Sequence, residues 1–196
     1  MELDSLYQEV ILEHYKRPLN KALKPNPTIQ VQHINTSCGD EITLNLHTDG
    51  KRVIEVSWDG IGCSISQAST SVVSDLVMGK EIGEVLKIIE SFQGMVLSKG
   101  TDSGNEELIG DGVAFAGVSK FPARVKCALL GWMATKDAEQ AQAIRQQRNQ
   151  KLTESDWTQV ADAPVDKQVW ATYRQALRDV TTQTGFPWTI TWPDAP

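Results

Sequence analysis

Three cysteines, Cys38, Cys63 and Cys127, place the strongest constraint on how this chain of 196 residues can fold. A single buried cysteine most often serves only as a small hydrophobic residue. Here, however, Gly39 and Asp40 follow Cys38, and three thiols with one carboxylate supply the four ligands of a closed tetrahedral zinc site. If these groups bind one ion, three distant segments of the chain must meet at one point.

The composition is that of an ordinary globular protein and limits the function classes. Hydrophobic residues make up 40% of the chain, so a core of normal size can be buried. The formal net charge of −6 argues against nucleic acid as a partner, because such binding depends on basic side chains. No apolar run approaches the roughly 20 residues that span a bilayer, and the acidic first residues do not resemble a signal peptide. We therefore expect a cytoplasmic protein with no membrane partner and with reduced cysteines.

Hydrophobic periodicity predicts an α+β fold for the first part of the chain. An amphipathic helix is expected to begin near Leu3 and to end before Pro18. Alternating apolar residues then predict a small antiparallel sheet of at least three strands, packed with helices, with strands at residues 29–35, 42–47 and 53–58.

Two helices, over residues 66–79 and 81–92, and a last helix that begins at Pro122 complete this part of the prediction. The polar, glycine-rich residues 98–112 are expected to form a loop, and the apolar run 113–118 is ambiguous. The three histidines, which lie in the first helix and in the strands, are expected to be structural: His14, His33 and His47.

The candidate ligands are expected to lie at the ends of these elements. In extended backbone, residues i and i+2 point to the same side. Cys38 and Asp40 should then face one point, with Gly39 leaving room for a close approach. Cys63 lies in a glycine-rich turn, after Gly62 and just before a helix. The partial positive charge of a helix N-terminus favours the thiolate form there.

Cys127 is expected early in the last helix, with Arg124 one turn before it on the same face. Three thiolates and one carboxylate around Zn²⁺ leave a net negative charge, and Arg124 is placed to supply a nearby cation. The residues alone leave open the alternative that Arg124 and Lys126 belong to an ordinary solvated helix face.

Three segments carry a resemblance to a known family: TSCGD around Cys38, GIGCSIS around Cys63, and FPARVKC, which ends at Cys127. Together they strongly resemble the IscU/NifU-N family of iron–sulfur cluster assembly proteins, over residues 1–135. Within that family the chain resembles the SufU-like branch. Lys126 stands where IscU-like scaffolds have a histidine, and the stretch between Cys63 and Cys127 is longer than in the scaffolds.

The resemblance implies a zinc-dependent sulfurtransferase that accepts persulfide sulfur from a SufS-type cysteine desulfurase, which is a pyridoxal-phosphate enzyme. It implies that Cys38 takes the sulfur and that Arg124 assists. It also implies that zinc is held by Cys38, Asp40, Cys63 and Cys127. A SufBCD-type scaffold is one candidate for the downstream partner. The alternative is an iron–sulfur cluster scaffold that uses the same cysteines, because thiolate-rich sites also suit iron.

The composition changes after Trp132. Residues 136–151 are polar and rich in glutamine, which predicts a helical linker, and residues 152–196 hold four of the six tryptophans and no cysteine. We expect a small, mostly helical appendage there, with a helix over residues 169–180 and a short strand-like end. The segments LTESDWTQVADAPV, WATYRQALRDVTTQTGFPW and ITWPDAP resemble phage tail fibre assembly chaperones. The chain is therefore interpreted as a fusion, and a third hypothesis is a phage tail assembly chaperone that carries a fused domain.

Overall fold

The structure of the protein is a computed structural model that describes residues 3–196. The chain divides into two compact units, Met1–Ala138 and Glu139–Pro196. Helix α5 (Pro122–Glu154) carries the backbone from the first unit into the second. Within the described residues, no helix is both long enough and apolar enough to cross a membrane.

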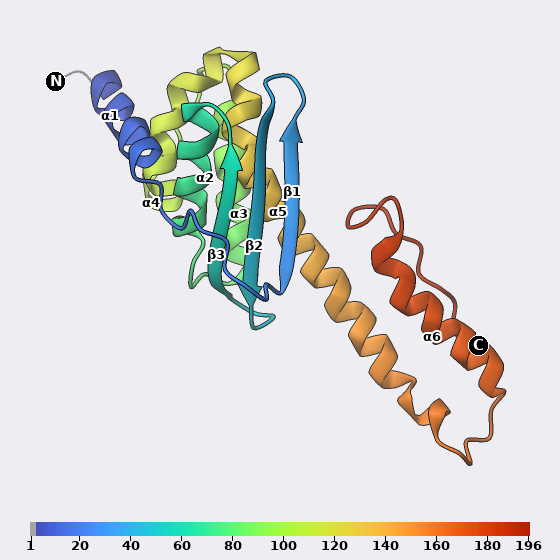
Figure 1. Ribbon diagram of the computed structural model, residues 1–196. Helices are drawn as coiled ribbons and strands as arrows, with labels where there is room; N and C mark the ends of the chain where they lie inside the picture. The colour runs from blue at the N-terminus through green and yellow to red at the C-terminus, as the bar shows by residue number, and fades with distance from the viewer. Residues whose placement is uncertain (1–2) are drawn as a thin grey trace. The chain divides into compact units, whose positions relative to one another are not determined.

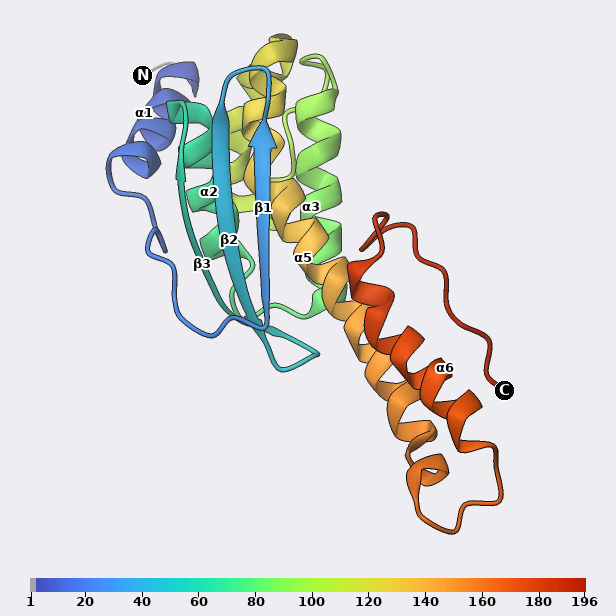
Figure 2. The same cartoon turned by 45° about the vertical axis from the view of Figure 1, so that its right-hand side comes forward.

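The first unit combines a small sheet with helices, which confirms the predicted α+β fold (Figure 1). The three strands pair in the order β1-β2-β3, and both pairs are antiparallel. Helices α2, α3 and α5 cover one face of this sheet (Figure 1, Figure 2). In chain order the elements before α5 are α1 (Leu3–Lys16), β1 (Ile29–Asn35), β2 (Asp40–Thr48), β3 (Val53–Ile61), α2 (Ser64–Leu76), α3 (Ile82–Leu97), α4 (Glu106–Ile109) and the 3-10 helix η1 (Gly110–Lys120).

The core lies between the sheet and these helices. Ile42, Leu44 and Leu46, alternate residues of the central strand β2, are fully buried. Phe92 of α3 stacks on Trp132 of α5, with the two ring centroids 3.7 Å apart. Complete burial of such a side chain stabilises the fold by roughly 1.5–3 kcal/mol. The core therefore fixes both the central strand, whose first residue is a candidate ligand, and the helix that carries the last cysteine.

Helices α2 and α5 approach each other closely at Gly131. A Cβ atom at this position would lie 2.8 Å from Thr70 Cβ and 2.9 Å from Thr70 Cα, which is too close for any side chain. Cys127 is one turn before Gly131 on α5, and such residues share a helix face. The contact therefore holds the beginning of α5 close to the beginning of α2.

The three histidines have structural partners, as expected. His14 of α1 contacts Ser71 Oγ through Nδ1 at 2.9 Å and Asp111 Oδ2 through Nε2 at 3.1 Å. This histidine therefore ties α1 to α2 and to η1. His33 and His47, which lie in β1 and β2, also have hydrogen-bond partners within the first unit.

Two expectations about secondary structure were wrong. Residues 98–112 are not a continuous loop, because they contain α4 and the beginning of η1, and η1 also includes residues 113–118. These short helices bury Ile109 and Phe115 in the core, and segments of this length show no clear hydrophobic period. The strand-like end is likewise wrong, since residues 189–196 belong to no helix or strand. The Gln183 side chain instead bonds the backbone of Thr191, through N–H and C=O, at 2.7 and 2.8 Å.

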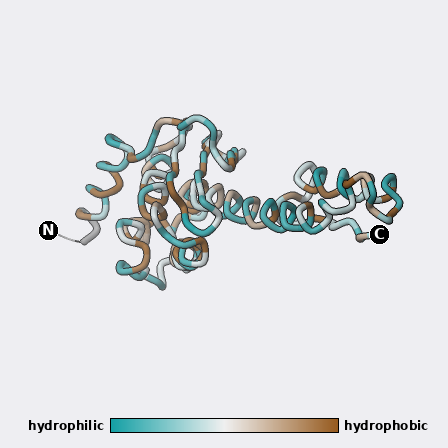
Figure 3. The backbone as a smooth tube through the Cα atoms, turned by 90° about the horizontal axis from the view of Figure 1, so that it is seen from below, coloured by the Kyte–Doolittle hydropathy of each residue, from teal (hydrophilic) through white to brown (hydrophobic). Residues whose placement is uncertain are grey.

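The second unit is built from the remainder of α5, the 3-10 helix η2 (Asp156–Gln159), α6 (Lys167–Asp179) and the 3-10 helix η3 (Val180–Thr182). Figure 3 shows that hydrophilic residues dominate the later part of α5. The buried Arg174 of α6 donates hydrogen bonds to the Leu152 carbonyl at 2.7 Å and to Ser155 Oγ at 2.8 Å. It thereby satisfies groups at the C-terminal end of α5 and joins the two helices of this unit.

Candidate metal centre

Asp40, the first residue of β2, is the buried centre of the candidate site. Its Oδ1 atom accepts a hydrogen bond from the backbone N–H of Cys63 at 3.0 Å, and Cys63 Sγ lies 3.4 Å from its Oδ2 atom. Cys63 is the N-cap residue of α2, as the sequence predicted. One carboxylate therefore links the beginning of the central strand to the beginning of a helix.

Gly62 is required by this link. A Cβ atom at Gly62 would lie 2.6 Å from Ser66 Oγ and 2.9 Å from Asp40 Cγ. The glycine before Cys63 therefore allows the backbone to pass next to the carboxylate.

Cys38 lies in the turn at residues 36–39 and not in extended backbone, so the reasoning that placed it beside Asp40 was wrong. Gly39 has φ of +77°, which residues with a side chain rarely adopt. A Cβ atom at Gly39 would meet no heavy atom within 4 Å, so the glycine is needed for its dihedral angle and not for space. The turn still directs Cys38 and Asp40 toward the same place.

Three of the four candidate ligands form one group. One ligand atom each from Cys38, Asp40 and Cys127 lies within 4.8 Å of the others, and the two sulfur atoms of Cys38 and Cys127 are 3.5 Å apart. Cys63 Sγ contacts Asp40 of this group at 3.4 Å. The structure thus groups two thiols with the Asp40 carboxylate, and the third thiol, that of Cys63, lies outside this group and contacts the carboxylate from the beginning of α2.

The spacing of the Cys38 and Cys127 sulfur atoms fits a tetrahedral thiolate-binding metal. Two thiolates bound to zinc at about 2.3 Å each, at a tetrahedral angle, lie about 3.8 Å apart. The 3.5 Å separation of the Cys38 and Cys127 sulfur atoms is close to that distance. The same ligands also suit iron, so the donor set does not choose between the two metals.

The pKa values of two acidic groups at the site are shifted in opposite directions, downward for Asp40 and upward for Cys127. Burial alone raises the pKa of the Asp40 carboxyl, but hydrogen bonds from Cys38, the Cys63 backbone N–H, Cys127 and Ser66 outweigh it and leave the pKa below its ordinary value. Burial also raises the pKa of the Cys127 thiol, and the hydrogen bond with Cys38 and the nearby acidic groups raise it further. The site therefore holds a carboxylate and resists an additional negative charge unless a cation is present.

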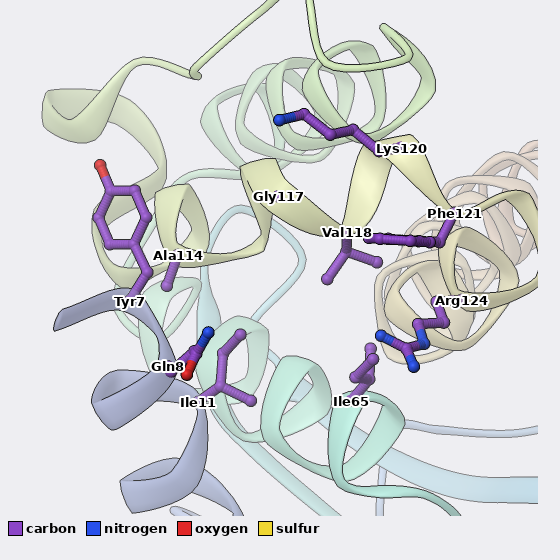
Figure 4. Close-up of a pocket in the computed structure, with 10 residues that line it drawn as sticks. All are labelled: Tyr7, Gln8, Ile11, Ile65, Ala114, Gly117, Val118, Lys120, Phe121 and Arg124. Atoms are coloured by element: carbon purple, nitrogen blue, oxygen red, sulfur yellow. The ribbon is translucent and has the colours of Figure 1, made fainter. Parts of the chain in front are cut away.

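Arg124 lies at the opening of the site. The three cysteines, Ile65 and Arg124 line a cleft of about 460 Å³. Ile65 and Arg124 also line an adjoining groove of about 470 Å³ between α1, η1 and the beginning of α5, where Figure 4 shows the Arg124 side chain pointing toward Ile65. The Arg124 guanidinium carbon lies 5.1 Å from the centroid of the Phe121 ring, which holds the cation near the opening.

Two contacts at the site were not predicted from the sequence. Asn35, at the end of β1, is buried, and its Nδ2 atom donates to Cys127 Sγ at 3.6 Å. Lys126 Nζ lies 3.5 Å from Ser37 Oγ, beside the turn that carries Cys38. An asparagine before a turn often bonds the backbone two residues on, and this is the one signal that could have drawn attention to Asn35.

Comparison with known protein families shows which class of protein this chain belongs to. Residues 6–128 match the family model of the NifU-like N-terminal domain. This match covers more than half of the chain, so the chain belongs to that family, and the resemblance seen in the cysteine motifs is confirmed. Residues 141–196 match the model of a phage tail assembly chaperone protein.

Individual relatives narrow the class to iron–sulfur cluster assembly proteins of the SufU and IscU type. The zinc-dependent sulfurtransferase SufU of Bacillus subtilis is 44% identical over 132 residues, which are 67% of this chain and 88% of the relative. The iron–sulfur cluster assembly scaffold protein IscU of Streptococcus pyogenes is 36% identical over 70% of this chain and 84% of its own length. A solved structure of a candidate assembly scaffold for the SUF system from Fervidobacterium islandicum is 33% identical, with a TM-score of 0.63, over 70% of this chain and 99% of that one.

Proposed function

We propose that residues 1–135 form a zinc-dependent sulfurtransferase that accepts persulfide sulfur from a SufS-type cysteine desulfurase for iron–sulfur cluster assembly. The observation that supports this proposal is the group formed by the ligand atoms of Cys38, Asp40 and Cys127, with the Cys63 thiol in contact with Asp40. The relative named as a zinc-dependent sulfurtransferase supports the choice of zinc. In this proposal the ligands are Cys38, Asp40, Cys63 and Cys127.

Cys38 is the proposed sulfur acceptor, because its position suits a ligand that leaves and returns. It lies on an exposed turn, whereas Cys127 is buried on a helix. Cys63 is fixed at the N-terminus of α2 by its bonds to Asp40. When bound, zinc would keep the thiols ionised at neutral pH.

The proposed transfer is a thiol–persulfide exchange. The Cys38 thiolate attacks the outer sulfur of the desulfurase persulfide and forms a new S–S bond. The S–S bond of the donor breaks, and its electron pair leaves with the donor cysteine as a thiolate, so that no net oxidation occurs. Arg124, at the opening of the cleft, is proposed to stabilise the anionic sulfur that arrives. We place this reaction in the cytoplasm, where three unpaired thiols remain reduced.

The first experiment is metal analysis and an absorption spectrum of protein purified without added metal. One zinc per chain and a colourless solution support the proposal. Iron with sulfide and a brown solution would favour the cluster scaffold. No bound metal would contradict both.

The second experiment measures stimulation of a SufS-type desulfurase. Wild type is expected to stimulate, Cys38→Ala to lose stimulation, and Thr36→Ala, an exposed residue of the same turn, to keep it. Cys63→Ala is expected also to lower the midpoint of thermal unfolding, since binding of a structural metal contributes folding free energy. Full stimulation by Cys38→Ala would contradict the acceptor assignment.

For the rest of the chain we propose a separate role. Residues 136–151 would act as a helical linker, and residues 152–196 as an interaction segment with the character of a phage tail assembly chaperone. The family match over residues 141–196 supports this assignment. Binding of a tail-fibre protein that survives deletion of residues 1–135 would test it.

A further inference from the structure

Asn35 is a buried asparagine that contacts both Cys127 and the turn that carries Cys38. It lies at the end of β1 with 8% of its surface exposed. Its amide nitrogen Nδ2 donates to Cys127 Sγ at 3.6 Å, a distance typical of a hydrogen bond to sulfur. Its amide oxygen Oδ1 accepts the backbone N–H of Ser37 at 3.2 Å.

The backbone of Asn35 also builds the turn that carries Cys38. The Asn35 carbonyl accepts the N–H of Cys38 at 3.2 Å and the N–H of Gly39 at 2.8 Å. Cys38 Sγ lies 3.9 Å from that same carbonyl oxygen. A carbonyl oxygen can accept a bond from a thiol but gives no support to a thiolate.

The two sulfur atoms are therefore treated differently by one residue. Both sulfur atoms lie near a backbone carbonyl oxygen, Cys127 Sγ at 3.7 Å from Ala123 and Cys38 Sγ at 3.9 Å from Asn35. Cys127 Sγ also accepts a hydrogen bond from the Asn35 amide N–H. A hydrogen bond to an ionised acceptor is about twice as strong as one between neutral groups. It also withdraws electron density from the sulfur, which makes a thiolate less nucleophilic.

We propose that Asn35 is a positioning residue that makes the two neighbouring thiols unequal. Its amide N–H retains Cys127 as a permanent ligand, and its turn presents Cys38 as the thiol that reacts. This inference rests on the proposed function, in which one thiol leaves the site and the others stay. Asn35 would then help to determine which of the thiols leaves the site.

Two substitutions separate the two contributions of Asn35. Asn35→Asp keeps an oxygen that can accept the Ser37 N–H and removes the N–H donor to Cys127. Asn35→Ala removes both side-chain bonds. Asn45→Ala is the matched control, because Asn45 is a buried asparagine of the same sheet whose side chain bonds the Lys24 carbonyl and Gln30.

The probes are zinc and cobalt(II), added to the full-length chain from which metal has been removed. Zinc affinity from competition with a chelator is expected to fall about 10- to 100-fold in Asn35→Asp, the usual effect of losing a residue that supports a ligand. The sulfur-to-cobalt charge-transfer band should move to longer wavelength, because the Cys127 thiolate becomes richer in electrons. In zinc-loaded protein, alkylation followed by mass spectrometry should show a smaller difference in rate between Cys38 and Cys127. Asn45→Ala should match the wild type in all three measurements.

Three results would overturn the inference. In the first, Asn35→Asp has the same zinc affinity, the same position of the charge-transfer band and the same order of alkylation as the wild type. Another is a loss of affinity without a shift of the band, which would indicate packing alone. The third is an equal effect in Asn45→Ala. If Asn35→Ala does not fold, Asn35→Asp decides, since it keeps the turn. Failure of the wild-type chain to take up either metal would instead contradict the proposed function, and this inference with it.

Discussion

Asp40 and Gly62 depend on each other at the centre of the candidate site. The carboxylate of Asp40 accepts the Cys63 N–H, and this bond forms only because the backbone at Gly62 passes close to it. Any side chain at position 62 would occupy the space of Asp40 Cγ and Ser66 Oγ. The two residues therefore constitute one contact, although they are far apart in the sequence.

Gly62→Ala should damage both stability and metal binding. The added methyl group would displace Asp40 or the beginning of α2, at a cost of about 1–3 kcal/mol in the free energy of unfolding. Chemical denaturation and zinc competition would measure the two effects. Gly83→Ala is the control, because a Cβ there meets nothing within 4 Å on α3. Wild-type zinc affinity in Gly62→Ala would contradict this account of the site.

The sequence identified the candidate ligands and the glycines next to them, but not the geometry of the turn or the part played by Asn35. Cys38, Asp40 and Cys63 stand in short motifs whose residue types suit a metal, so their chemistry is visible without a structure. The turn at Gly39 depends on a positive φ angle, which alternation along a strand does not reveal. Asn35 contacts a cysteine 92 residues away. No local pattern encodes such a contact. The ligand assignment itself stays a prediction until metal is measured.

Among the helices, α5 contains a buried acid. Glu139 is 1% exposed. Among residues 3–196, neither of its carboxylate oxygens has a hydrogen-bond partner. Burial raises the pKa of this carboxyl from 4.5 to about 7. The Glu139 carboxyl of the folded chain therefore gains or loses its proton near neutral pH.

Glu139 should make the free energy of unfolding depend on pH. Below the ordinary pKa of 4.5 both the folded and the unfolded chain hold the proton, and Glu139 has no effect. Between that pH and about 7, the unfolded chain releases the proton and the folded chain retains it. The free energy of unfolding should therefore fall as pH rises through this window, by on the order of 3 kcal/mol.

Glu139→Gln should remove this contribution, because glutamine does not ionise. Chemical denaturation at about pH 5 and at about pH 8 would compare it with the wild type and with Glu90→Gln, an exposed acid of α3. The same pH dependence in Glu139→Gln as in the wild type would show that Glu139 does not titrate in this way.

The elements differ in how far the sequence could define them. The strands and the longer helices were predicted because their apolar residues recur at a clear period, as in β2 and α3. Residues 98–120 were not, because α4 and η1 are too short to show a period and depend on burial of residues such as Phe115. Helix α5 continues to Glu154 through polar residues whose hydrophobic pattern gives no helix boundary.

For the whole molecule, the question is whether the first unit functions alone. The division between Ala138 and Glu139 follows the family matches, which cover residues 6–128 and 141–196. The alignment with one solved relative includes 70% of this chain and 99% of the relative. A unit of that length is therefore a complete structure in another protein.

A chain that ends at Ala138 should retain the proposed activity. We expect zinc content and desulfurase stimulation within about twofold of the full-length protein, because all four candidate ligands and Arg124 lie before this point. The full-length chain is the control, and metal analysis with the desulfurase assay gives the result. Loss of zinc from the shortened chain would show that the second unit supports the site.

The crossing of α2 and α5 at Gly131 bears on which ions the candidate site would accept. This glycine sets how near the two helices come, and Cys127 lies one turn away on the same helix face. The spacing of the helices that carry Cys63 and Cys127 is thus limited by a residue that is not itself a candidate ligand. We expect selectivity for ionic radius to respond to helix spacing, so that redesign of the site for a larger cation such as cadmium would begin at position 131.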